Sequence, residues 1–291
     1  MSENITYKYQ PSHIQLDTST AIDVLKQRIS NPIVTGAVPA TDSTVLQRIT
    51  AEFVSQAIQL RDLRICPEEY AMFMDHAGYH ERYTNYYSLN LAEKSFEHFA
   101  ALQLLGMNED DVFIDLASEG SPLPEITSRL FHAEAFAQDI MYEPGVHENR
   151  IGGDACDMPV PNAFASKAAL TCSLEHFEAS GDIKLFQELG RVLKRGGKVC
   201  VIPLYLYSFP ATQTDARYSA VCDVPFDSDC TVFCADGWGN RHARFYTVET
   251  LRNRILDRFA TAFSFSIYRI VRTDSIADSI YARWAMVAEK V

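Results

Sequence analysis

Apolar residues recur at helical spacing in the first hundred residues of the chain. Between residues 46 and 60 every third or fourth position is apolar, the pattern of an amphipathic helix: Leu46, Ile49, Phe53, Ala57 and Leu60. Asp42 or Ser43 is the expected N-cap of this helix, since both side chains can accept hydrogen bonds from free backbone amides. We predict a helical N-terminal cap or lid over residues 1–89.

A second helix is predicted over residues 90–105, with signals at both ends. Asn90 can cap it, with Glu93 reaching back from the third position, and Gly106 allows a left-handed turn at the end. Residues 79–87, between the two helices, are rich in tyrosine and histidine.

From residue 111 the pattern changes to short apolar runs that alternate with helices. Strands are expected at 112–117, 135–141, 149–155, 166–172, 198–206, 263–271 and 280–289, and helices at 124–131, 182–194 and 247–259. This alternation predicts a doubly wound, mostly parallel seven-stranded α/β sheet over residues 90–291, whose last two strands can pair as an antiparallel hairpin. Residues 206–246 read as a loop-rich insertion in this domain.

Composition narrows the class of protein. The 291 residues are 47% hydrophobic and 22% charged, as in an ordinary globular protein, and the net charge is -12. A chain with this negative charge repels phosphate backbones and anionic lipid surfaces. We therefore expect neither nucleic acid nor a membrane as a partner. Seven cysteines without a CxxC pair argue against a disulfide framework and a metal site, and no signal peptide or membrane span is evident, so a cytoplasmic protein of unknown oligomeric state is expected.

Polar residues follow successive predicted strands. They are Asp115, Asp139, Asp154 and the group Ser173, Glu175 and His176. Because ligands of parallel sheets bind beyond the carboxyl ends of the strands, these side chains are expected to line one edge. A carboxylate about 24 residues after the first strand can bind both hydroxyls of a ribose. Any one of these aspartates could instead only cap the following turn.

Five segments resemble the class I S-adenosylmethionine-dependent methyltransferases, in particular their type 11-like domains. In order they are IDLASEGSP, QDIMYEPG, GGDACDMPVP, ALTCSLEHF and LGRVLKRGGKVCVIPLYL, and the resemblance covers about residues 90–291. It implies S-adenosylmethionine as the cofactor.

The resemblance also implies which residues bind that cofactor. Asp115, Ala117, Ser118, Glu119 and Gly120 would lie against its methionine part; Asp139 would bind the ribose, Asp154 and Ala155 the adenine, and Ser173 would lie near the sulfonium. Two features depart from the family. Ala117, Glu119 and Ser121 stand at the usual glycine positions, and only about ten residues separate Asp139 from the next strand, too few for the usual helix.

Methyl transfer needs an aligned acceptor and, for a hydroxyl, a proton acceptor. His176 is the candidate general base, because an imidazole titrates near neutrality; it could instead only hold the helix start by hydrogen bonds. Arg241, His242 and Arg244 could bind an anionic small-molecule acceptor, or could pair with nearby aspartates on a surface. Tyr87 could close over the bound ligands or pack against the sheet.

The resemblance therefore implies S-adenosylmethionine-dependent methylation of a small polar acceptor, in particular O-methylation of a sugar or natural product. A non-catalytic binding or assembly protein with an altered cofactor loop is the alternative. Nicotinamide-dependent oxidoreduction is a third possibility that shares the sheet, but it needs a glycine fingerprint that this chain lacks.

Overall fold

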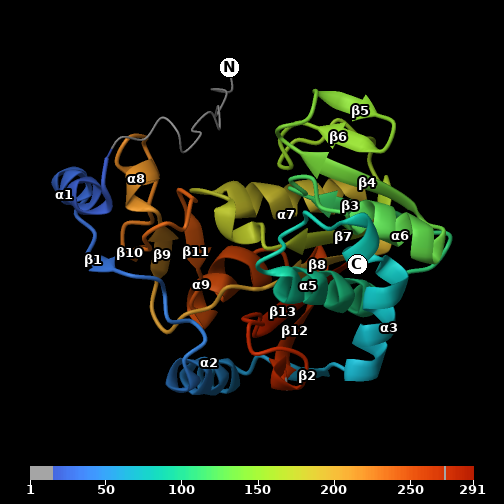
Figure 1. Ribbon diagram of the computed structural model, residues 1–291, viewed down its shortest axis with the longest axis horizontal. Helices are drawn as coiled ribbons and strands as arrows, with labels where there is room; N and C mark the ends of the chain where they lie inside the picture. The colour runs from blue at the N-terminus through green and yellow to red at the C-terminus, as the bar shows by residue number, and fades with distance from the viewer. Residues whose placement is uncertain (1–15, 272) are drawn as a thin grey trace.

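The computed structural model describes residues 16–271 and 273–291, which form two β-sheets with helices around them (Figure 1). The large sheet has nine strands in the order β2-β12-β13-β8-β7-β3-β4-β6-β5. Their bounds are β2 (Leu60–Arg64), β3 (Val112–Leu116), β4 (Glu134–Asp139), β5 (Gly145–His147), β6 (Arg150–Gly152), β7 (Ala165–Thr171), β8 (Leu193–Ile202), β12 (Phe263–Val271) and β13 (Trp284–Lys290).

Most neighbours in this sheet are parallel. Strands β2 and β12, β8 and β7, β7 and β3, β3 and β4, and β4 and β6 pair in parallel, whereas β13 runs antiparallel to both β12 and β8. The predicted doubly wound, mostly parallel α/β fold is confirmed, and β12 and β13 pair as the expected antiparallel strands. The sheet has nine strands instead of seven because β2 and β5 add to its two edges.

The N-terminal segment contains strands as well as helices. Its helices are α1 (Thr18–Arg28), α2 (Ser43–Ser55), α3 (Pro67–Ala77) and α4 (Tyr79–Arg82). Asp42 caps α2, as the sequence predicts, by accepting from the amides of Thr44 and Val45. Strand β2 joins the large sheet and β1 (Ile33–Thr35) joins the second one. The role of residues 1–89 as a cap or lid stays a prediction, and residues 1–15 lie outside the described part.

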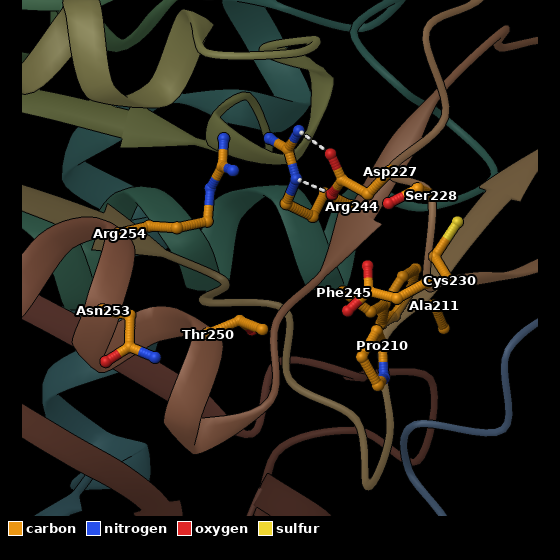
Figure 2. Close-up of a pocket in the computed structure, with 11 residues that line it drawn as sticks. Pro210, Ala211, Asp227, Ser228, Cys230, Arg244, Phe245, Thr250, Asn253 and Arg254 are labelled. Carbon is orange, nitrogen blue, oxygen red and sulfur yellow. Dashed lines mark hydrogen bonds and ion pairs between the residues drawn. The ribbon is translucent and has the colours of Figure 1, made fainter.

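The second sheet corrects the expectation of a loop-rich insertion at 206–246. It has the order β1-β10-β9-β11, with β9 (Ala211–Thr214), β10 (Thr231–Cys234) and β11 (Ala243–Phe245), and the short helix α8 (Ala216–Ser219) follows β9. These strands are three or four residues long, too short for an alternating pattern to be recognised. Where this sheet meets the helical segment 248–256, a cavity of about 290 Å³ lies between Pro210, Asp227, Arg244 and Asn253 (Figure 2).

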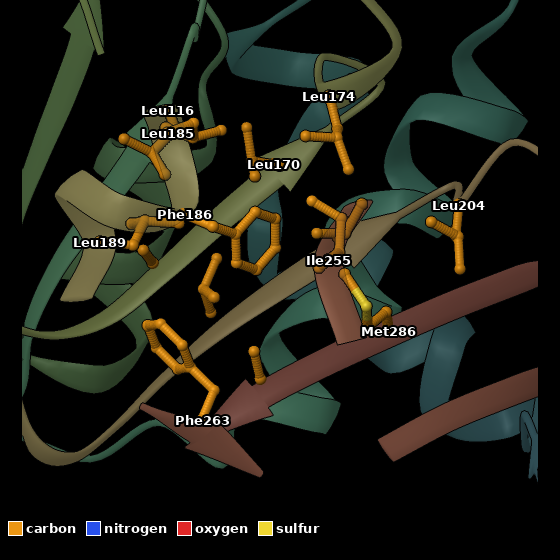
Figure 3. Packing of buried hydrophobic residues seen from close by; sticks show 14 of the residues in the cluster. Leu116, Leu170, Leu174, Leu185, Phe186, Leu189, Leu204, Ile255, Phe263 and Met286 are labelled. Atoms are coloured by element: carbon orange, nitrogen blue, oxygen red, sulfur yellow. The ribbon is translucent and has the colours of Figure 1, made fainter. Parts of the chain in front are cut away.

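Helices cover both faces of the large sheet, so alternate residues of one strand enter two separate cores. Phe113 packs in a core with α3, α5 (Leu91–Leu105) and α6 (Leu123–Phe131). The next residue, Ile114, packs in the other core, with α2 and α7 (Gly181–Val192). Phe186 of α7 lies in that core near Leu170 and Phe263 (Figure 3). Burial on both faces explains why the central strands read as continuous apolar runs.

Two helix ends differ from the sequence prediction. Asn90 stands at the N-cap of α5 without a capping hydrogen bond from its side chain. Glu93 does not reach back; its carboxylate accepts hydrogen bonds from the amides of Tyr281 and Ala282. The helix expected over 247–259 is α9 (Val248–Leu251) followed by a π-helical turn, η3 (Arg252–Leu256).

Among residues 16–271 and 273–291, every helix is too short or too polar to cross a lipid bilayer.

Candidate functional site

The candidate site lies at the edge of the large sheet where its parallel strands end, at the point where the strand order reverses. From β3 the chain adds β4 and β6 on one side, and then β7 and β8 on the other. Crevices at such switch points are where α/β sheets bind ligands. The structure places Asp115 near the end of β3, Asp139 at the end of β4 and Asp154 two residues after β6, as expected from the sequence.

Asp115 is the most unusual group at this edge. Its side chain is fully buried, and neither carboxylate oxygen has a hydrogen-bond partner. Burial raises the pKa of Asp115 to about 7; the hydroxyl of Ser121 lowers it and the nearby Asp139 carboxylate raises it further. A buried carboxylate without a partner is costly unless a hydrogen-bond donor or a cation joins it.

Three residues of the loop after β3 have the left-handed backbone that glycine favours, and two of the three are not glycine. Ala117 has φ of 53°, Glu119 of 44° and Gly120 of 74°, all in the left-handed region. A non-glycine residue in this region costs on the order of 1 kcal/mol. The Glu119 side chain is exposed, so it points away from the protein interior.

Hydrogen bonds from β4 hold this strained loop. The amide of Ala117 donates to the side chain of Gln138 (3.1 Å), that of Ser118 to the Gln138 carbonyl (2.9 Å), and that of Glu119 to the carboxylate of Asp139 (2.8 Å). The other oxygen of Asp139 accepts from the amide of Met141 (2.9 Å). Asp139 therefore shapes the loop, and a carboxylate oxygen still has a lone pair free for a ligand hydroxyl.

Tyr142, which the sequence analysis does not single out, lies over the same loop. Its hydroxyl is 3.2 Å from the Ser118 hydroxyl and 3.3 Å from the amide of Gly120. The guanidinium of Arg150 packs over its ring at 5.0 Å from the centroid. Loops that bind anions or carboxylates use such amides, so Tyr142 stands where a ligand would approach Gly120.

The far end of the edge is closed by a hairpin, as the short spacing after Asp139 requires. Strands β5 and β6 form an antiparallel pair in place of a helix. Asp154 is exposed and one of its oxygens accepts from the amide of Cys156 (2.9 Å). Ala155 is buried in the core beneath it. The side chain of Gln138 donates to the carbonyl of Gly153 (2.7 Å) and so joins this turn to β4.

His176 lies across the switch point, in the 3₁₀ turn η2 (Leu174–His176) that follows β7. Its Nδ1 is 2.5 Å from the carbonyl of His242, which can only accept, so Nδ1 carries the proton. The unprotonated Nε2 lies 3.6 Å from a carboxylate oxygen of Glu175. Trp238 stacks on the ring at 6.0 Å between centroids. This tautomer leaves Nε2 able to accept a proton.

Ser173, Glu175 and His242 surround this turn. The Ser173 hydroxyl donates to the carbonyl of Leu116 (3.2 Å) and thereby ties the turn to β3. Glu175 is 3% exposed, and its second oxygen has no hydrogen-bond partner. His242 is buried and donates to the carbonyl of Glu175 (3.1 Å); burial, followed by the charge of Arg244, lowers its pKa well below the usual value, so it is neutral.

Arg241 and Arg244 are held by internal acidic partners. Arg244 is 2% exposed and donates to both oxygens of Asp227 (2.8 and 3.2 Å) and to the carbonyls of Phe177 and Ala179 (Figure 2). Arg241 makes a two-pronged pair with Glu178 (2.6 and 2.9 Å). Of the two alternatives left open by the sequence, the contacts show pairing with acidic groups of the protein, and a role of these arginines in binding an anionic acceptor stays a prediction. The sequence could not show this because the acids lie in other loops.

The tyrosine-rich segment packs on His98 of α5. The Tyr79 hydroxyl is 2.6 Å from Nδ1 of His98, and Nε2 lies 3.3 Å from the Tyr86 hydroxyl and 3.4 Å from that of Ser121. Burial lowers the pKa of His98 to about 3, so this ring stays neutral. Tyr87 is 46% exposed, with the ammonium of Lys94 over its ring at 5.5 Å.

A second polar group missed by sequence reasoning lies beside α5. The Cys172 thiol, one residue after β7, is 3.3 Å from the Tyr205 hydroxyl and 3.8 Å from that of Tyr281. Lys94 donates to both oxygens of the fully buried Glu97 (3.1 Å each). The one sequence signal near this group is the SLEH motif of residues 173–176, which directly follows Cys172.

Two cavities lie elsewhere, at the seam with the second sheet. Neither is lined by residues of the loops after β3, β4 or β6. Arg244 and Arg254, which line one of them, are paired with Asp227 and Asp182. We assign the candidate site from the unpartnered buried carboxylates and the sheet topology. Among the described residues no cluster of three or more histidine, cysteine, aspartate or glutamate side chains could hold a metal ion.

Comparison with known proteins gives structural matches alone. No family model matches the sequence, and no curated protein matches it significantly. The Burkholderia thailandensis 1,6-didemethyltoxoflavin-N1-methyltransferase, solved with bound 1,6-didemethyltoxoflavin and S-adenosylhomocysteine, matches with a TM-score of 0.45 at 14% identity, over 80% of this chain and 93% of that one.

Two further solved structures match with similarly low sequence identity. The YcgJ protein of Bacillus subtilis has a TM-score of 0.43 at 10% identity, over 67% of this chain and 98% of that one. A SAM-dependent methyltransferase of Methanosarcina mazei has a TM-score of 0.38 at 15% identity, over 64% and 94%. The chain is similar to class I S-adenosylmethionine-dependent methyltransferases in its motifs, and solved methyltransferases are among its structural matches.

Proposed function

We propose that the protein transfers a methyl group from S-adenosylmethionine to a small polar acceptor. The observation that carries the proposal is the buried, unpartnered carboxylate of Asp115 at the switch point of a parallel sheet. An ammonium group bound there would supply the missing partner, and the methionine part of the cofactor has one. The surroundings of Asp115 therefore fit the cofactor.

The remaining edge residues suit the other parts of that cofactor. Asp139 would accept from the ribose hydroxyls while it holds the loop of Ala117, Ser118, Glu119 and Gly120 in place. Asp154 and the backbone at Ala155 would lie beside the adenine, and Ser173 near the sulfonium. The bound cofactor supplies a methyl group that is already activated, so the chief task of the protein is to align the acceptor with it.

His176 is the proposed proton acceptor for a hydroxyl substrate. The carbonyl of His242 fixes the tautomer, Nε2 is free to accept, and the Glu175 carboxylate at 3.6 Å would stabilise the resulting imidazolium. Substitution of a group of this kind typically lowers the rate 10²- to 10⁴-fold. O-methylation of a sugar or natural product stays a prediction.

Binding of S-adenosylhomocysteine tests the proposal. We expect calorimetry to detect binding to the wild-type protein, and Asp115→Asn to weaken it at least about tenfold, since one charged hydrogen-bonded pair contributes on the order of 1.5 to 3 kcal/mol. The control is Asp23→Asn, whose carboxylate lies on the exposed surface of α1. Lack of binding by the wild-type protein at millimolar ligand would overturn the proposal.

A non-catalytic binding protein is the second candidate, and one observation favours it. The hydroxyl of Tyr142 already contacts Ser118 and the amide of Gly120, where the cofactor would approach. If the altered loop is closed in this way, Tyr142→Phe would create affinity for S-adenosylhomocysteine that the wild-type protein lacks. Nicotinamide-dependent oxidoreduction is tested by fluorescence titration with the reduced dinucleotide.

A further inference from the structure

Six polar side chains gather where β7 and β8 end beside α5. We call them the Cys172 cluster: Lys94, Glu97, Cys172, Glu175, Tyr205 and Tyr281. Three of them, Cys172, Tyr205 and Tyr281, keep partial contact with solvent, whereas Lys94, Glu97 and Glu175 are buried behind them. The cluster therefore combines buried charged groups with partly exposed polar ones.

Direct contacts and electrostatic coupling hold the cluster together. Cys172 lies against the hydroxyls of Tyr205 and Tyr281 at 3.3 and 3.8 Å. The pKa of the Cys172 thiol is raised by burial first and by the Glu175 carboxylate second. Burial and the charges of Cys172 and Glu175 likewise raise the pKa of Tyr205. The Glu175 carboxylate is thus electrostatically coupled to the thiol and to Tyr205.

The charges of the cluster do not balance. The carboxylate of Glu97 is matched by the ammonium of Lys94, which donates to both of its oxygens. Neighbouring Glu93 is matched by two backbone amides. Glu175 has Nε2 of His176 3.6 Å from one oxygen and no hydrogen-bond partner for the other. A carboxylate buried in this way is destabilising unless a cation or hydrogen-bond donor joins it.

We propose that the methyl acceptor carries an amino group that binds to Glu175 as an ammonium ion, with the hydroxyl oxygens of Tyr205 and Tyr281 as further acceptors. This inference rests on the proposed function and names its substrate class. An ammonium ion has three N–H donors, and the cluster offers one carboxylate and two phenol oxygens to receive them.

The same cluster disfavours an anionic acceptor. A carboxylate or phosphate would be placed beside Glu175, and Lys94 is already neutralised by Glu97. Arg241 and Arg244 are paired with Glu178 and Asp227. The predicted anionic acceptor therefore lacks a cationic partner among the groups that suggested it.

Three matched probes test the charge preference in solution. Benzylamine, benzyl alcohol and benzoate have one shape and differ in charge. With the full-length protein saturated with S-adenosylhomocysteine, we expect calorimetry to show benzylamine binding at least tenfold more tightly than the other two. Equal affinity for the three probes, no binding of benzylamine, or a preference for benzoate would overturn the inference.

Glu175→Gln is the decisive variant, because it keeps the shape of the side chain and removes its charge. We expect it to lose the tenfold amine preference and to bind S-adenosylhomocysteine as the wild-type protein does. Glu289→Gln, a half-exposed acid on β13, is the matched control and should keep both properties. If Glu175→Gln does not fold, Tyr281→Phe, which removes one oxygen, should lower amine affinity several-fold; an unchanged affinity would contradict the inference.

The outcomes separate this inference from the proposed function. Loss of S-adenosylhomocysteine binding in the wild-type protein would overturn the function. Binding of S-adenosylhomocysteine without amine preference would overturn the acceptor class alone. If Glu175→Gln weakens S-adenosylmethionine but not S-adenosylhomocysteine, and leaves amine binding unchanged, Glu175 faces the positive sulfonium and the inference is wrong.

Discussion

The carboxylate of Asp139 accepts a hydrogen bond from the backbone amide of Glu119 at 2.8 Å and so ties the loop after β3 to the end of β4. Both residues lie at the edge where the cofactor is proposed to bind. A second oxygen of the same carboxylate holds Met141. One side chain thus fixes two turns that border the site.

Asp139→Ala should therefore lower both stability and cofactor affinity. Two backbone amides lose a charged acceptor, which costs about 1 to 3 kcal/mol in the free energy of unfolding. Urea denaturation and calorimetry with S-adenosylhomocysteine measure the two effects. Asp23→Ala on exposed α1 should change neither, and a stable Asp139→Ala protein with full affinity would contradict the assigned role.

The strained loop makes a prediction of opposite sign. Glu119 has φ of 44°, which glycine adopts at little cost, so Glu119→Gly should raise the free energy of unfolding by up to about 1 kcal/mol. Ala92→Gly, within helix α5, is the control and should lower it by about 1 kcal/mol. If both substitutions destabilise equally in urea denaturation, the loop is not strained at Glu119.

Sequence patterns predicted the central part of this architecture better than its additions. Strands β3 and β4 are marked by short apolar runs, because helices bury them on both faces. Once these two strands are recognised, the positions of Asp115 and Asp139 are predicted too, because both residues lie at a strand end. The four-stranded sheet escaped prediction because its strands are three or four residues long and pair segments as distant as Ile33 and Val232.

Long-range pairing also explains what was missed in the site. Arg244 read as an exposed cation because nothing near it in the sequence shows that Asp227 and Asp182 converge on it. Cys172 received no role from the sequence, because its contact with Tyr281 spans 109 residues. Burial without a partner, as at Asp115, is a property of the folded chain that no local pattern displays.

Asp115 should give the protein a characteristic dependence of stability on pH. Its pKa is about 7 in the folded protein and 3.8 as the reference value for an unfolded chain, so the folded state binds more protons between these values. The stabilisation is complete below about pH 4 and is lost as the pH rises toward 7, by about 1.4 kcal/mol per pH unit. Glu97 and Glu93, whose pKa values burial also raises, contribute in the same direction.

The contribution of Asp115 is isolated by comparison with Asp115→Asn. The unfolding free energy of the wild-type protein minus that of Asp115→Asn should fall from pH 4 to pH 7, because the wild type alone loses stability and the asparagine does not ionise. Urea denaturation at four or five pH values measures it. A difference that stays constant over this range would show that the pKa of Asp115 is not raised.

Cofactor affinity should depend on the same proton in the opposite direction. If the ammonium group of S-adenosylhomocysteine pairs with ionised Asp115, the proton must leave before binding. Affinity should then rise up to tenfold per pH unit as the pH approaches 7 and level off above it. Calorimetry in buffers of different ionisation enthalpy should show release of up to one proton at pH 6 and none for Asp115→Asn.

Arg244→Met should test whether this arginine is structural, as its contacts indicate. The substitution leaves Asp227 and the buried Asp182 with one cation fewer and the Phe177 carbonyl without a donor, whereas the Ala179 carbonyl keeps the guanidinium of Arg254. This should cost about 3 kcal/mol or more in the free energy of unfolding. Arg252→Met breaks an exposed pair with Asp257 and should cost less than about 1 kcal/mol. Both proteins should still bind S-adenosylhomocysteine when folded at low temperature. Full stability of Arg244→Met, together with weaker binding of benzoate than in the wild-type protein, would instead restore Arg244 as an anion-binding residue.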